Sequence, residues 1–145
     1  MSHESSQVWK EFEENDISHS AAHYLMAIDE LRRDYWYARS VDIARELDIT
    51  PGSCSTGLKA LIKKWFIEED KNKFILLSEE GERLVEKIQK NRKLFHDFFR
   101  LQLGANEEES IITACKIEHL IPWHITRKLE KFLKNYEENN KVKAR

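Results

Sequence analysis

Apolar residues recur every three to four positions along most of this chain, and this helical spacing is interrupted once, near the middle. It predicts a helix from Ser18, a second short helix over 41–47, and a third that begins at Pro51, whose ring suits the first helical position. Two short apolar runs, 65–67 and 74–77, then flank a polar turn, a pattern typical of a β-hairpin. Helices followed by a hairpin in this order predict a winged helix-turn-helix. The inner face of the third helix is expected to carry Cys54, Leu58, Leu61, Ile62 and Trp65.

The second half of the chain is predicted to be helical. Ser78 is expected to cap a long helix that ends before Gly104, and Asn106 is expected to cap another that runs to about Leu120. Pro122 opens a last helix, after which the tail is polar and expected to fray. We therefore predict a mainly α fold in four segments: an N-terminal arm (1–17), a winged helix-turn-helix domain (18–77), an all-helical domain (78–137) and a polar tail (138–145).

The charge of the chain is nearly balanced, with 34% charged residues and a net charge of −2. A DNA-binding domain is usually basic, so this balance argues mildly against DNA binding. Local potential decides such binding, however, and five lysines fall close together in the sequence: Lys59, Lys63, Lys64, Lys71 and Lys73.

The two cysteines, Cys54 and Cys115, form no paired motif, which argues against a secreted disulfide scaffold and fits a reducing cytoplasm. No stretch of sequence is long and apolar enough to cross a membrane, and the N-terminus has no apolar signal region. We therefore expect a soluble cytoplasmic protein without a membrane partner.

The outer face of the third helix carries the side chains expected of a helix that reads DNA. Small hydroxyls near its N-terminus would reach phosphates or base edges, and lysines further along would neutralise phosphates. Gly57 would leave room for close approach. The candidate DNA contacts are Arg39, Pro51, Ser53, Ser55, Thr56, Lys59, Lys63 and, at the wing tip, Lys73. An ordinary amphipathic helix with a solvated outer face would show the same pattern.

A second constellation has the residue types of a metal site. Cys115, Glu118 and His119 are spaced to lie on one side of a helix, and thiolate, carboxylate and imidazole are standard ligands of divalent transition metals. His23, beside the apolar face of the first helix, is the best candidate for a fourth ligand, and Met26 lies one turn along. A buried Glu–His hydrogen bond beside a passive core cysteine, with His23 at a partly exposed interface, would explain the same residues.

The sequence resembles the diphtheria toxin repressor and manganese transport regulator family of metal-dependent repressors, from about Ser18 to Tyr136. The matching stretches are YARSVDIA at 37–44, TPGS at 50–53, LSEEG at 77–81 and ACKIEH at 114–119. The last is the most specific, because Cys or Glu followed by Ile-Glu-His is the family's metal-ligand segment. The family's additional SH3-like domain is not expected here.

The resemblance assigns metal ligation to Cys115, Glu118 and His119, together with His23 from the first helix. Met26 falls at a further ligand position of manganese-type members, and His96 at an accessory one. Two departures from the family pattern occur: Arg92 replaces a ligating histidine, and Ile111 stands where iron-type members have another. Arg92 is therefore expected to pair with Glu118 or a neighbouring acid and to stand in for a second ion.

By this resemblance the chain is expected to be a homodimeric repressor that binds a palindromic DNA operator when a divalent ion sits between its two domains. Fe(II) is the expected ion, with Mn(II) second and Zn(II) possible. A winged-helix regulator that has lost metal dependence is the main alternative, and a protein-interaction winged helix is another. A metalloenzyme with a small organic substrate is disfavoured, because the sequence has no HExxH, nucleophile elbow or phosphate loop.

Overall fold

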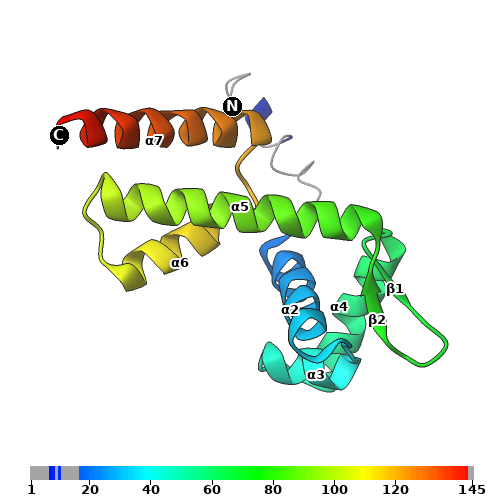
Figure 1. Ribbon diagram of the computed structural model, residues 1–145. Coiled ribbons are helices and arrows are strands. Elements are labelled where there is room, and N and C mark those ends of the chain that lie inside the picture. Colours follow the sequence, from blue (N-terminus) through cyan, green and yellow to red (C-terminus); the bar gives the residue numbers. More distant parts are fainter. Residues whose placement is uncertain (1–6, 9, 11–16, 144–145) are drawn as a thin grey trace.

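The computed structural model describes residues 7–8, 10 and 17–143, and most of the predicted N-terminal arm lies outside these residues. The chain first forms α2 (His19–Tyr35), α3 (Ser40–Glu46) and α4 (Pro51–Lys63), then the strands β1 (Ile67–Glu69) and β2 (Ile75–Leu77). It continues as α5 (Glu79–Leu101), α6 (Glu107–Ile117) and α7 (Trp123–Lys143), as Figure 1 shows. The fold class is therefore the predicted one: a mainly α chain with a winged helix-turn-helix followed by a helical domain. Among the described residues the only sheet is two-stranded, so they contain no SH3-like barrel.

Local capping starts the helices where the sequence predicts. The Ser18 side chain accepts a hydrogen bond from the Ala21 amide, and Thr50 accepts one from the Ser53 amide with Pro51 directly after the cap. The two strands pair antiparallel, with Ile67 opposite Leu77, and form the wing. The three helices and the wing thus form one small domain below α5 (Figure 1).

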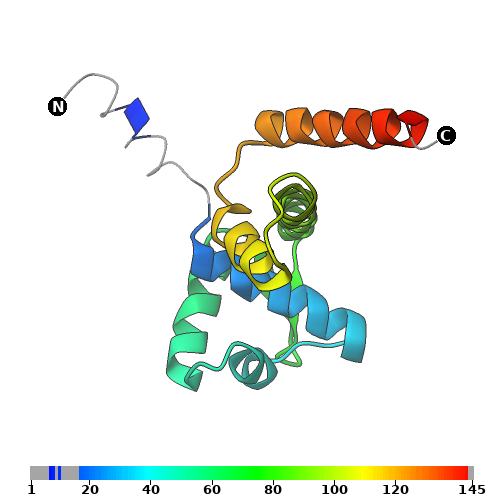
Figure 2. The same ribbon diagram turned by 90° about the vertical axis from the view of Figure 1, so that its left-hand side faces the viewer.

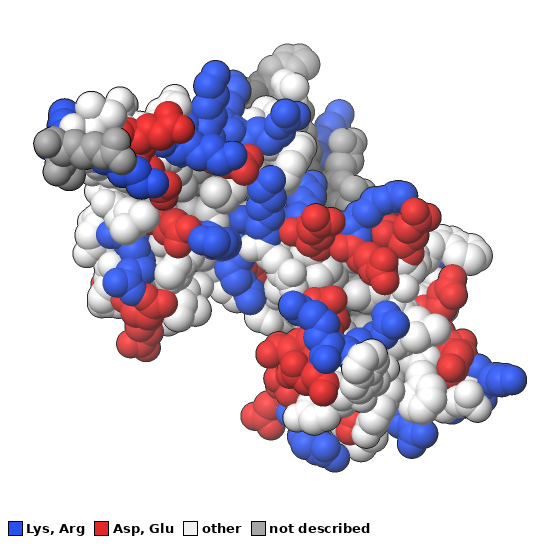
Figure 3. All heavy atoms as spheres, in the orientation of Figure 1, with Lys and Arg blue, Asp and Glu red and all other residues white. Residues whose placement is uncertain are grey.

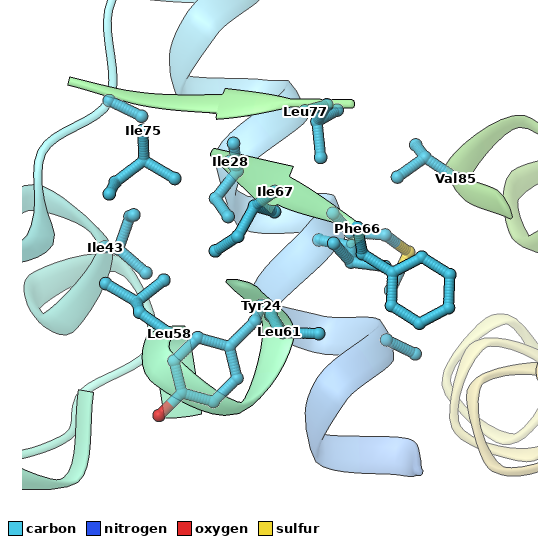
Figure 4. Packing of buried hydrophobic residues seen from close by; sticks show 14 of the residues in the cluster. Tyr24, Ile28, Ile43, Leu58, Leu61, Phe66, Ile67, Ile75, Leu77 and Val85 are labelled. Atoms are coloured by element: carbon cyan, nitrogen blue, oxygen red, sulfur yellow. The ribbon is translucent and has the colours of Figure 1, made fainter. Parts of the chain in front are cut away.

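The core of this domain is built where α2, α3, α4 and the wing meet (Figure 4). Its fully buried side chains include Ile28, Ile43, Leu61, Ile67 and Ile75. The expected inner face of α4 is partly wrong: Ile62 is 38% exposed and Trp65 is 80% exposed. Ile62 lies a hundred degrees around the helix from Leu61, and α4 ends before Trp65, whose positive φ turns the chain toward the wing.

The helix α5 joins the two halves of the molecule. Near its start, Val85 and Ile88 pack into the winged-helix core, and Gly81 lies against the Phe66 carbonyl. Further along, α5 packs on α6, and α7 crosses α5 on the side away from the winged helix (Figures 1 and 2). None of the described helices has an apolar stretch long enough to cross a membrane.

Two helix ends differ from the sequence prediction. Where a frayed tail was expected after Glu137, α7 continues to Lys143, since its last residues are mostly good helix formers. The capping box of Asn106 and Glu109 is present, but α6 ends at Ile117 instead of about Leu120. Glu118 is the C-cap of α6, so the next residue, His119, lies in the turn beyond the helix.

Candidate metal centre and nucleic-acid interface

The first turns of α2 and the last turn of α6 bring a thiol and two imidazoles together. The Nε2 atom of His23 lies 3.3 Å from the Sγ atom of Cys115, residues that are 92 positions apart in the sequence. His19 lies one turn before His23 on the same face of α2, with ring centroids 4.5 Å apart. One nitrogen or sulfur atom from each of these three side chains lies within 4.8 Å of the other two. Among the described residues, this is the only such group of histidine, cysteine and acidic side chains.

His119 borders the same cluster from the turn after α6. Its ring centroid lies 5.0 Å from that of His19, and its buried Nδ1 atom has no hydrogen-bond partner among the described residues. Burial, followed by the neighbouring imidazoles, lowers the pKa of both His23 and His119 below the ordinary value. Both side chains are therefore held in the neutral form, which is the form that ligates metals.

Cys115 is half-buried, and burial raises the pKa of its thiol, with the nearby Glu118 carboxylate adding to the effect. The Arg92 guanidinium beside the thiol acts in the opposite direction, but the net pKa of Cys115 is still raised. A coordinating thiol is deprotonated by its metal. The donor set of three imidazoles and one thiol is chemically suited to a divalent transition metal.

The remaining predicted ligand, Glu118, is engaged elsewhere. Its side chain has no exposed surface, and both carboxylate oxygens accept hydrogen bonds from Arg92 of α5, at 2.5 Å from Nε and 2.8 Å from Nη2. This is the expected pairing of Arg92 with Glu118. The side chain of Asn91, also buried, donates to the Glu118 backbone carbonyl at 2.8 Å and so holds the end of α6 against α5.

The two further candidates, Met26 and His96, have other surroundings. Met26 is 8% exposed and belongs to the winged-helix core. The ring nitrogens of His96 face Asp97 at 3.3 Å and Glu107 at 2.9 Å, so His96 pairs with acids of α5 and α6. Among the described histidine, cysteine and acidic side chains, His96 is not part of the group formed by His19, His23 and Cys115.

Sequence reasoning missed His19. The signal was the spacing of His19 and His23, which puts two imidazoles on one face of a helix. The resemblance drew attention instead to His23 and Met26, and no local pattern showed that the start of α2 would meet the end of α6.

The candidate DNA-reading face of α4 is exposed as the sequence predicts. Pro51, Ser53, Thr56, Lys59 and Lys63 are exposed, and Ser55 is half-buried. The Thr56 hydroxyl donates to the Gly52 carbonyl at 3.1 Å, so it is held against its own helix. Gly57 serves the core: a side chain there would overlap the ring of Tyr24, whose hydroxyl donates to the Ser53 carbonyl at 3.0 Å. The expectation that Gly57 leaves room for DNA is therefore wrong.

The two basic candidates outside α4 lie at the wing. The Arg39 guanidinium stacks over the Phe74 ring, 4.8 Å from its centroid, and the Lys73 ammonium pairs with Glu69 at 2.8 Å. Acidic and basic side chains are interspersed over the winged helix on the face shown in Figure 3, whereas basic side chains gather over α7. On that face, nearby acidic side chains therefore offset much of the positive charge of the winged helix.

Known proteins match most of this chain. Residues 78–144 match the family model described as "Iron dependent repressor, metal binding and dimerisation domain". The chain is 28% identical over 103 residues to the HTH-type transcriptional regulator MntR of Lysinibacillus sphaericus, covering 71% of this chain and 73% of that protein. It is 25% identical over 117 residues to MntR of Bacillus subtilis, covering 81% and 82%. These relatives are named as transcriptional regulators rather than enzymes.

Two solved structures share the fold over most of this chain. The structure of the manganese regulator SloR aligns with a TM-score of 0.70 and 25% identity, covering 79% of this chain and 53% of that one. The metal-dependent transcriptional regulator MtsR aligns with a TM-score of 0.71 and 26% identity, over the same shares. The family model over residues 78–144, the MntR relatives and these two structures together support the resemblance of the chain to the diphtheria toxin repressor and manganese transport regulator family of metal-dependent transcriptional regulators.

Proposed function

We propose that this protein represses transcription by binding operator DNA when a divalent transition metal is held between its winged helix (18–77) and its helical domain (78–137). The observation that carries the proposal is the 3.3 Å approach of His23, from the winged helix, to Cys115, from the helical domain. A ligand pair that spans two domains makes their relative orientation depend on the ion.

His23, Cys115 and His119 are the residues that would hold the ion, and Glu118 supports them through its pairing with Arg92. When bound, the ion would supply positive charge and directional bonds that tie α2 to the end of α6. The lowered pKa values of His23 and His119 leave their ring nitrogens free of the competing proton near neutral pH.

The link from metal to DNA runs through α2. Its first turns carry His23, and its buried face packs on α3 and α4, so an orientation imposed on α2 is transmitted to the reading helix. An ion that favours the DNA-competent orientation by a few kcal/mol shifts the population substantially, and DNA then favours metal binding to the same extent.

A homodimer would present two such reading helices to a palindromic operator. Large apolar side chains are exposed on the helical domain at Leu101, Leu103, Ile111, Ile112, Phe132 and Tyr136. An exposed apolar surface of this kind favours association with a second copy. In a dimer, the separation of the two α4 helices would decide whether both enter the major groove on the same side of the duplex.

For DNA contact we propose the exposed face of α4, with Pro51, Ser53, Ser55, Thr56, Lys59 and Lys63, and the flanking Arg39 and Lys73. The serines and the threonine would position the helix on phosphates and base edges, and the basic side chains would neutralise phosphates. Such a regulator acts where the DNA is, in the cytoplasm.

The alternative is a regulator that has lost metal dependence, and the pairing of Arg92 with Glu118 is the observation that favours it. The Arg92–Glu118 salt bridge would then supply the positive charge that an ion would otherwise bring to the end of α6. The two functions differ in one measurable respect: whether DNA affinity changes with metal.

The test is a titration of DNA binding by fluorescence anisotropy. Operator duplexes are first selected from a random pool, and chelator-treated protein is then titrated with Fe(II), Mn(II) or Zn(II). We expect metal to tighten binding in the unmodified chain but not in His23→Ala or Cys115→Ser, while His124→Ala, an exposed histidine of α7, behaves as the unmodified chain. Tight binding that is indifferent to metal and to both substitutions would establish the metal-independent regulator instead.

A further inference from the structure

We propose, on the basis of the function proposed above, that the regulatory ion is bound by nitrogen and sulfur alone, through His19, His23, Cys115 and His119, and that this site selects Zn(II) over Mn(II). Compared with the four ligands predicted from the sequence, this set contains His19 in place of Glu118.

The geometry of His19, His23 and Cys115 is close to that of a tetrahedral site. In such a site, with metal bonds of about 2.0–2.3 Å, the ligand atoms lie about 3.3–3.8 Å apart. The distance from His23 Nε2 to Cys115 Sγ is already 3.3 Å, and the three candidate ligand atoms all lie within 4.8 Å of one another. These side chains are exposed or half-buried, and the longest of the three separations would shorten by at most about 1.5 Å on binding.

We take His119 as the fourth ligand, although its ring nitrogens lie outside the group of His19, His23 and Cys115 whose ligand atoms are within 4.8 Å of one another. Its ring lies 5.0 Å from that of His19, and it has a buried nitrogen without a hydrogen-bond partner among the described residues. A hollow lined by Ser18, His19, Lys116 and His119 opens beside this pair of rings and gives an ion access to the site from solvent. The three histidines and Cys115 come from two domains, so the four-ligand site still bridges them.

Glu118 is withheld from the ion by Arg92. Both of its oxygens are hydrogen-bonded to the guanidinium, and its side chain is fully buried. Turning the carboxylate toward a metal would leave the half-buried Arg92 charge unpaired, which is costly. The cluster therefore offers an ion no carboxylate oxygen among the described residues within reach of His19, His23 and Cys115.

The chemical type of these ligands then determines which ion binds most tightly. Imidazole and thiolate ligands in a four-coordinate arrangement are typical of Zn(II), whereas Mn(II) prefers carboxylate, carbonyl and water oxygens. Mn(II) also stands lowest among the first-row divalent ions in general affinity, and Zn(II) stands well above it. Fe(II), expected first from the sequence, falls between the two.

The test uses Co(II) as a spectroscopic substitute for Zn(II) in the full-length, chelator-treated protein without DNA. We expect one Co(II) per chain, strong visible bands of a tetrahedral centre, and a near-ultraviolet sulfur-to-cobalt charge-transfer band. Zn(II) should abolish these bands at equal concentration, and Mn(II) should leave them in place at large excess.

Variants identify the ligands. Cys115→Ser should remove the charge-transfer band, and His19→Ala should weaken Co(II) binding by about 10–100-fold or more, since losing even an outer-shell partner costs about that much. The control His124→Ala should leave the bands unchanged, and Glu118→Gln should keep their position and strength per bound ion even where it weakens binding, because Glu118 supports the site without ligating the ion. His19 is exposed in the first turn of α2, so His19→Ala is expected to fold, which circular dichroism checks.

Weak bands of a six-coordinate centre, displaced by Mn(II) and altered by Glu118→Gln but not by His19→Ala, would overturn the proposal. Failure of the proposed function is read separately, from DNA anisotropy. If Mn(II) still controls DNA binding while the cobalt spectra show an oxygen-rich site, only the present proposal fails. If no Co(II) binds and DNA affinity ignores every metal, both fail.

Discussion

Replacing Arg92 with leucine removes the guanidinium that neutralises the fully buried Glu118 carboxylate. Both oxygens of that carboxylate lose the hydrogen bonds that the guanidinium donates. The charge is left buried at the C-terminal end of α6, where the helix dipole is also unfavourable to an anion. We expect Arg92→Leu to lower the free energy of unfolding.

The magnitude follows from the exposure of the two partners. Breaking a buried ion pair by removing one member costs about 3–5 kcal/mol. The Glu118 side chain has no exposed surface, but that of Arg92 is 40% exposed, so water can reach part of the space that the guanidinium leaves. We therefore expect a loss near the lower end, about 3 kcal/mol.

The assay is urea unfolding followed by circular dichroism, at one protein concentration and with chelator present so that no ion replaces the guanidinium. Arg83→Leu is the matched control, because Arg83 lies on the same helix and pairs with the exposed Glu79, and it should cost under about 1 kcal/mol. The double variant Arg92→Leu, Glu118→Leu should recover most of the loss, since neither partner is then left charged. An Arg92→Leu variant as stable as Arg83→Leu, or a double variant whose cost equals the sum of the single ones, would refute the reasoning.

Three further substitutions test the fold and the DNA-binding face. Gly81→Ala should destabilise the protein by about 2 kcal/mol or more in thermal unfolding, because its Cβ would overlap the Phe66 carbonyl, whereas Gly52→Ala, with open space around it, should not. Asn91→Leu should cost about 1–3 kcal/mol in urea, because it leaves a carbonyl at the end of α6 without its donor, and an unchanged midpoint would contradict that role. Lys59→Ala should weaken DNA binding equally for all sequences and reduce the slope of log affinity against log salt by about 1, and an unaltered slope would remove this lysine from the phosphate contacts.

The order of elements was predictable because its signals are local. The interruption of the helical spacing locates the wing, and Ser18, Thr50, Ser78 and Asn106 each cap the helix that the sequence assigns to them. The errors lie at helix ends, such as Trp65, where the chain leaves the helix and the spacing no longer reports which way a side chain points.

The candidate metal site was predictable only in part. A metal site is indicated by the side-chain types of Cys115, Glu118 and His119 together with the family resemblance. His23 does lie against Cys115, as the sequence predicts. The sequence did not show which of these side chains are available to an ion and which pair with other residues. Glu118 is held by a residue 26 positions away, and the helical spacing of His19 and His23 did not show that both would meet Cys115 of α6.

The sequence by itself determined the succession of helices and strands, the domain that reads DNA and the chemical types available for a metal, because spacing, capping and side-chain identity act over a few residues. The tertiary structure alone decided which of those side chains meet. The start of α2 and the end of α6 come together because each packs on α5, and the ligands available to an ion depend on distances of a few ångströms between segments that are far apart in the chain.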